Sequence, residues 1–115
     1  MSTGQSIRAE FEEIKTLGFV AMGPGYVAIG APLEHPSREM LIQNLTDVTL
    51  TFSDDGITDK FKLPRMSYRE VDYTANKSQT QGFYGGKHVQ WWVKEDSASP
   101  TKGEVCISSI YGLND

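Results

Sequence analysis

Short runs in which apolar and polar residues alternate restrict the fold of this chain more than any other feature. The run at residues 48–53 (VTLTFS) has Val, Leu and Phe at every second position. The run at residues 88–94 (HVQWWVK) repeats the pattern with Val, Trp and Val. A period of two with β-branched and aromatic residues is typical of a strand that buries one face. The sequence therefore predicts strands that share a core.

Five further segments are weaker candidates for strands: residues 26–30, 39–45, 60–63, 68–73 and 104–111. Turn-forming residues separate the segments at short intervals, as Gly-Pro-Gly, His-Pro-Ser, Asp-Gly, Gly-Gly and Ser-Pro. Many short strands separated by turns predict an all-β fold, an antiparallel, jelly-roll-like β-sandwich of about seven or eight strands. The length of 115 residues fits one such domain.

The same alternation predicts which side chains face the core. The inward rows are expected to be Met40/Ile42, Val48/Leu50/Phe52, Phe61/Leu63, Val71/Tyr73, Val89/Trp91/Val93 and Val105/Ile107. The single cysteine, Cys106, lies in an apolar run and is expected to behave as a small buried hydrophobe.

The N-terminal 25 residues leave two conformations open. Ile7, Phe11, Ile14 and Leu17 recur at helical spacing, but residues 11–19 also alternate as in a strand. We expect residues 1–25 to form an arm, extended or partly helical, and residues 26–115 to form the sandwich.

Charge and hydrophobicity argue against two classes of partner. The chain carries 15 acidic and 11 basic residues, and the basic residues form no run or stripe. An electrostatic footprint for nucleic acid is therefore absent from the sequence. No hydrophobic segment reaches membrane-spanning length, and the N-terminus lacks the pattern of a secretory signal. We expect neither nucleic acid nor membrane as a partner, and synthesis in a cytoplasm.

Three aspartates around one glycine, Asp54, Asp55 and Asp59, are the only candidate metal ligands. Calcium takes such oxygens, but its loops alternate their ligands over about a dozen positions and end in a bidentate carboxylate. The spacing here fits better with Asp55-Gly56 in a hairpin turn that requires positive φ. We expect no metal or cofactor. We also expect no enzyme, because His35 and His88 have no partner at the spacing of a catalytic motif.

Adjacent strand residues point to opposite faces, so Trp91 in the core implies an outward Trp92. Such a ring is either covered by the same chain, or buried by a protein partner, or used to stack a sugar. Other apolar residues are also expected on the outside. The candidate interface residues are Trp92, Tyr84, Phe83, Tyr68, Phe11 and Ile14.

A succession of motifs resembles a group of small virion proteins of tailed bacteriophages. It runs through YVAIGAPLEHPSREMLIQNLTDVTLTFSDDGITDKFKLP, VDYTANKSQTQGFYGG, VQWWVKED and GEVCISSIYG, and covers roughly residues 26–112. The resemblance implies a fold and supplies no catalytic or ligand residue.

The resemblance also implies a non-enzymatic structural subunit of the virion. Such a subunit would form a homo-oligomeric ring, collar or adaptor at the head–tail connector or tail, against portal, adaptor, tail or major capsid proteins. Two alternatives are a capsid decoration (cement) protein and a receptor- or carbohydrate-binding module of a tail fibre.

Overall fold

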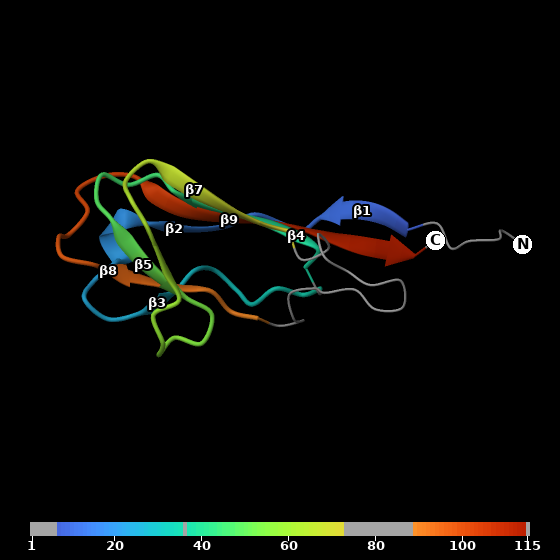
Figure 1. The fold of residues 1–115 in the computed structure, drawn as a ribbon, viewed down its shortest axis with the longest axis horizontal. Coiled ribbons are helices and arrows are strands. Elements are labelled where there is room, and N and C mark those ends of the chain that lie inside the picture. Colours follow the sequence, from blue (N-terminus) through green and yellow to red (C-terminus); the bar gives the residue numbers. More distant parts are fainter. Residues whose placement is uncertain (1–6, 36, 73–88, 115) are drawn as a thin grey trace, which may run out of the picture.

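The computed structural model describes residues 7–35, 37–72 and 89–114, and these form two antiparallel β-sheets packed face to face (Figure 1). Sheet A contains β1 (Ile7–Phe11), β2 (Lys15–Gly18), β4 (Glu39–Asn44), β7 (Ser67–Asp72) and β9 (Glu104–Asn114). Sheet B contains β3 (Val27–Ala28), β5 (Leu50–Ser53), β6 (Phe61–Leu63) and β8 (Trp92–Glu95). A single turn of 3₁₀-helix, η1 (Phe19–Ala21), links β2 to the loop before β3.

The strand order is that of a jelly roll. Sheet A runs β1-β9-β4-β7, with β2 also paired to β9, and sheet B runs β3-β8-β5-β6. When β1 and β2 are counted as one interrupted strand, the chain has eight strands. In this count sheet A has the order 1-8-3-6 (β1/β2, β9, β4, β7), and sheet B has the order 2-7-4-5 (β3, β8, β5, β6). The predicted all-β, jelly-roll-like sandwich is thereby confirmed.

The inward rows of both sheets meet in one core, as their alternation predicts. Sheet B contributes Leu50, Phe52 and Val93, and sheet A contributes Met40 and Ile42, all of them almost without solvent exposure. The remaining members of the predicted rows are buried in the core or packed against it: Val48, Phe61, Leu63, Val71, Val89, Trp91, Val105 and Ile107. Tyr73 lies outside the described residues.

The N-terminal segment is extended and belongs to sheet A. Both β1 and β2 pair with β9, and the pairing shifts by one residue between Phe11↔Ile110 and Lys15↔Ile107. Residues 12–14 therefore face only Ser108 and Ser109, which makes a bulge. The Glu12 amide donates to the Ser109 carbonyl at 2.9 Å within it. Residues 7–18 are thus edge strands of the sandwich, and the helical alternative is not found there.

Strand pairing explains why the period of two prevails in this segment. Leu17 packs against the core from β2, and the backbone of both strands bonds to β9. A helix of this length would leave its terminal backbone groups without partners and gains little stability by itself.

Asn44 ties the end of β4 to the hairpin of sheet B. Its buried amide donates to the carbonyls of Val48, Leu63 and Pro64 at 2.9 to 3.1 Å. Its oxygen accepts from the amide and the hydroxyl of Thr46. The Asn-Leu-Thr of the QNLTD motif is therefore a buried structural element that joins the two sheets.

Candidate interaction surface

The outer face of sheet A carries side chains that the alternation turns away from the core. Directly paired residues in antiparallel strands point to the same face. Leu41 is paired with Ser108 on one side and Glu70 on the other, and Ile110 is paired with Phe11. Since Met40 and Ile42 face inward, these outward residues share the opposite face. Sheet B lies on the other side of sheet A (Figure 1).

An apolar groove of about 260 Å³ runs across this face. Its lining residues are Phe11, Glu39, Met40, Leu41, Glu70, Ser108 and Ile110. Phe11 is 72% exposed, an unusual state for a large aromatic side chain. The groove combines hydrophobic surface with the carboxylates of Glu39 and Glu70.

Tyr68 lies on the same face, nearer the start of β7. It is paired with Gln43, which is paired in turn with Cys106. The Tyr68 side chain is exposed, whereas Cys106 is buried, and this burial raises the pKa of the thiol. The buried cysteine agrees with the prediction, although its strand phase places it outside the main core.

The other predicted interface residues differ in their surroundings. Ile14 is exposed and belongs to the bulge between β1 and β2. Phe83 and Tyr84 lie outside the described residues. Of the six residues predicted for an interface, Phe11 and Tyr68 therefore share one face, with Ile14 in the neighbouring bulge.

Trp92 is covered by a loop of its own chain. Trp91 points inward and is 7% exposed, whereas Trp92 points outward and is half-buried. A Cβ built on Gly56 would lie 3.0 Å from Cε2 of the Trp92 indole, so the glycine backbone lies against the ring. The predicted phase of the two tryptophans is confirmed. Among the alternatives left open for Trp92, the structure shows cover by its own chain.

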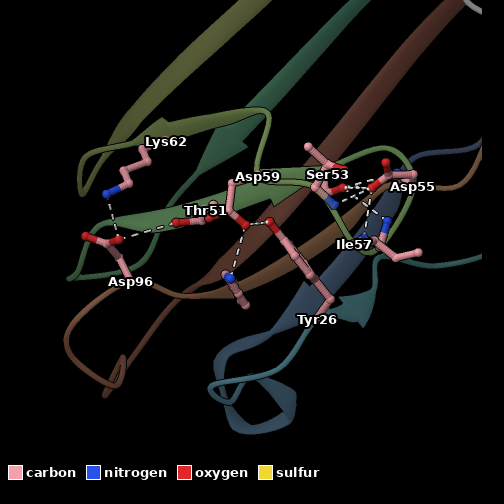
Figure 2. A network of polar contacts seen from close by, with 11 residues as sticks. Tyr26, Thr51, Ser53, Asp55, Ile57, Asp59, Lys62 and Asp96 are labelled. Carbon is pink, nitrogen blue, oxygen red and sulfur yellow. Dashed lines mark hydrogen bonds and ion pairs between the residues drawn. The ribbon is translucent and has the colours of Figure 1, made fainter.

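The Asp-Gly turn belongs to a loop that joins β5 to β6, and Gly56 has φ +75, as predicted. Asp55 Oδ1 accepts from the Ser53 hydroxyl and from the amides of Ile57 and Thr58, at 2.6 to 2.8 Å (Figure 2). These bonds hold the pKa of Asp55 well below its usual range, and the bond from the Ser53 hydroxyl has the largest effect. Asp55 therefore closes the loop in the manner of an Asx turn.

Asp59 belongs to a polar network on the outer face of sheet B (Figure 2). The Tyr26 hydroxyl donates to Asp59 Oδ1 at 2.5 Å, and Lys94 Nζ lies 3.1 Å from the same oxygen. The hydrogen bond from Tyr26 lowers the pKa of Asp59 most, and the contact with Lys94 lowers it further. Burial and the Asp59 carboxylate raise the pKa of Tyr26. Lys94 also lies over the Tyr26 ring, 4.7 Å from its centroid.

Two further ion pairs lie close to this network. Asp54 Oδ1 lies 3.6 Å from Lys60 Nζ, and Asp96 Oδ1 lies 3.0 Å from Lys62 Nζ. A polar cleft of about 420 Å³ opens beside them, lined by Pro24, Thr51, Asp59, Lys94, Glu95, Asp96 and Ser97. Within the described residues, no three His, Cys, Asp or Glu side chains are grouped as metal ligands. Of the three candidate aspartates, Asp55 closes the loop, Asp59 belongs to the network and Asp54 lies near Lys60.

Sequence reasoning did not assign Leu41, Glu39, Glu70 or Ser108 to the groove. The signal for the first two was available, because they lie out of phase with Met40 and Ile42 in the same strand. Their proximity to Phe11 was not available, since it depends on which strands lie beside β9.

Comparison with protein families, curated proteins and solved structures finds no match for this chain. In the part of the chain that the structure describes, no helix has the length and apolarity to cross a bilayer.

Proposed function

We propose that this chain is a non-enzymatic structural subunit of a bacteriophage virion. It assembles in multiple copies at the head–tail connector or the tail, as part of a ring, collar or adaptor. The apolar groove on the outer face of sheet A is the observation that carries this proposal. Phe11, Leu41 and Ile110 offer hydrophobic surface there that a partner protein would bury.

The lining of the groove suits a protein partner. Fully burying a Phe, Leu or Ile side chain is worth roughly 1.5–3 kcal/mol, so two or three such side chains make an effective centre for an interface. Glu39 and Glu70 at the same groove add polar specificity.

The fold is compatible with a structural role, and the positions of the resembling motifs support it. Jelly rolls occur in viral capsid proteins as well as in lectins and enzymes, so the fold alone does not decide the function. The motifs that resemble phage virion proteins have structural roles in this chain. Asn44 and Thr46 join the sheets, and Asp55 with Gly56 closes the loop against Trp92.

The partners follow from this role. Copies of the chain itself and other virion proteins (portal, adaptor, tail or major capsid protein) would cover the groove. The chain is made in the cytoplasm of the bacterial host and ends in the virion.

A phage that carries a groove variant tests the proposal. Leu41→Glu places a third carboxylate in the groove while leaving the inward residues of β4 unchanged. We expect this variant to fold and to be depleted from purified particles at least about tenfold, which corresponds to 1.4 kcal/mol of binding. The matched control is Ile57→Glu, because Ile57 is 83% exposed in the loop between β5 and β6.

Two results would contradict the proposal. One is the absence of the wild-type chain from purified particles. The other is equal incorporation of the folded Leu41→Glu and Ile57→Glu variants. A purified domain that binds a glycan through Trp92, with unchanged incorporation of both variants, would favour the receptor-binding alternative.

A further inference from the structure

The turn between β6 and β7 presents an exposed methionine. Met66 has φ 54, a left-handed conformation that non-glycine residues rarely adopt, and its side chain is 68% exposed. The Ser67 hydroxyl donates to the Pro64 carbonyl at 2.5 Å and braces the turn. The turn therefore holds an apolar side chain out toward solvent at this end of the sandwich.

Two cations flank this methionine. Arg65 and Lys102 line, together with Met66, a shallow cavity of about 610 Å³ at this end of the sandwich. Among the described residues, neither Arg65 nor Lys102 forms an ion pair with a carboxylate. The Asp47 carboxylate in the same cavity accepts from the amide and the hydroxyl of Thr101. We call Arg65, Met66 and Lys102 the basic end.

The groove has the opposite charge. Its only charged lining residues are Glu39 and Glu70, and neither is paired with a cation in the described part of the chain. Two copies that met groove to groove would bring four carboxylates together, which is unfavourable. Charge therefore favours a contact between the groove of one copy and a cationic, apolar surface such as the basic end.

The two surfaces lie apart along the strands, so they cannot meet within one copy. The groove is at the Glu39 end of β4, where Glu39 is paired with Ile110. The basic end adjoins the other end of β4, where Asn44 is paired with Ser67. Asn44 lies five positions beyond Glu39, about 17 Å along the strand. In Figure 1, β7 begins at the left end of the sandwich, whereas β1 lies toward the right.

We infer that the basic end of one copy docks into the groove of the next, head to tail. Met66 enters the groove against Phe11, Leu41 and Ile110. Arg65 and Lys102 face Glu39 and Glu70. A contact between two different surfaces continues from copy to copy and closes into a ring when the rotation allows it. This inference rests on the proposed multi-copy role and identifies the neighbour that fills the groove.

Cysteine cross-linking between two variants tests the contact. Both are made with Cys106→Ala, so that each has one thiol. One carries Met66→Cys at the basic end, and the other carries Ser108→Cys in the groove. Under mild oxidation of the mixture, we expect a covalent heterodimer to form at least about fivefold faster than with Ile57→Cys in place of Met66→Cys. Equal rates with the exposed Ile57→Cys control would overturn the inference.

Charge reversal tests the polar part of the same contact. Adding Glu70→Lys to the groove variant should slow the cross-link about two- to fivefold, the range of an exposed ion pair. Adding Arg65→Glu to the Met66→Cys variant should restore the rate. Slowing without restoration would contradict the assigned pairing of the basic end with the groove.

The outcomes separate this inference from the proposed function. Several copies in the particle without a preferred cross-link would remove the head-to-tail contact and leave the virion role. A preferred cross-link, with the chain absent from particles, would support the contact and remove the virion role.

Discussion

Gly103 shows at the scale of one residue why the chain needs a glycine where it enters β9. Its φ is +95, and a Cβ built there would lie 2.0 Å from the Leu45 carbonyl oxygen. Leu45 directly follows β4, and its amide donates to the Glu104 carbonyl at 2.9 Å. A side chain at residue 103 would therefore push apart the two strands that pair in the middle of sheet A.

We predict that Gly103→Ala lowers the free energy of unfolding by about 3 kcal/mol, because it combines a clash with backbone strain. Urea unfolding followed by tryptophan fluorescence measures the change. Gly23→Ala is the matched control, since no atom would lie within 4 Å of its Cβ and its φ is not in the left-handed region. Equal stability of the two variants would show that the close approach to Leu45 is not maintained in solution.

The two adjacent tryptophans should respond differently to truncation. Trp91→Ala removes a buried ring that packs near Phe61, and should cost about 3–5 kcal/mol of stability. Trp92→Ala should cost less, about 1–2 kcal/mol, because that ring is half-buried against Gly56. Thermal unfolding of both variants compares them. A larger loss for Trp92→Ala would contradict the assigned faces of β8.

At the scale of an element, the loop between β5 and β6 depends on ionised Asp55. The pKa of this carboxyl is lower in the folded chain than in the unfolded chain, because the Ser53 hydroxyl and two loop amides bond to its charged form. Its contribution to stability is therefore present above the ordinary carboxyl pKa of about 4 and is lost as the pH falls through the lowered folded value.

We predict that Asp55→Asn reduces the dependence of stability on pH below about pH 4. Urea unfolding of the variant and the wild type at a series of pH values measures this. Ile57→Ala serves as the control, because it keeps the backbone amide that bonds to Asp55 and removes only an exposed side chain. A wild-type dependence on pH in Asp55→Asn would show that the loop does not rely on this carboxylate.

A strand could be predicted from the sequence only where the pattern that determines it lies within the same segment. The strands from β4 to β9 could be read from the sequence, because their alternation and turn residues are local. The segment of β1 and β2 could not, because its apolar residues fit both periods and the choice is made by pairing with β9. The cover over Trp92 could be named from the sequence only as one of three alternatives, since the choice depends on a glycine 36 positions away in the chain.

At the scale of the whole molecule, sheet A is the larger sheet and the one that carries the groove. The outer face of sheet B is partly covered by the loop between β5 and β6, and it carries a network of paired charges, as at Asp59 and Lys94. The molecule measures 56 × 23 × 21 Å, and the groove and the basic end lie apart along it. Sequence patterns alone showed exposed apolar residues, but the groove appeared only when the strand order placed Phe11 near Leu41.

The reconstruction of the phage particle by electron cryomicroscopy tests the central claim most directly, because it shows what covers the outer face of sheet A. We predict several symmetry-related copies of the jelly roll at the neck or tail, with the groove at Phe11, Leu41 and Ile110 filled by a neighbouring protein. Many copies on the shell, with the groove covered, would assign the chain to capsid decoration instead. A particle without the chain, or one in which the groove of every copy faces solvent, would contradict the account.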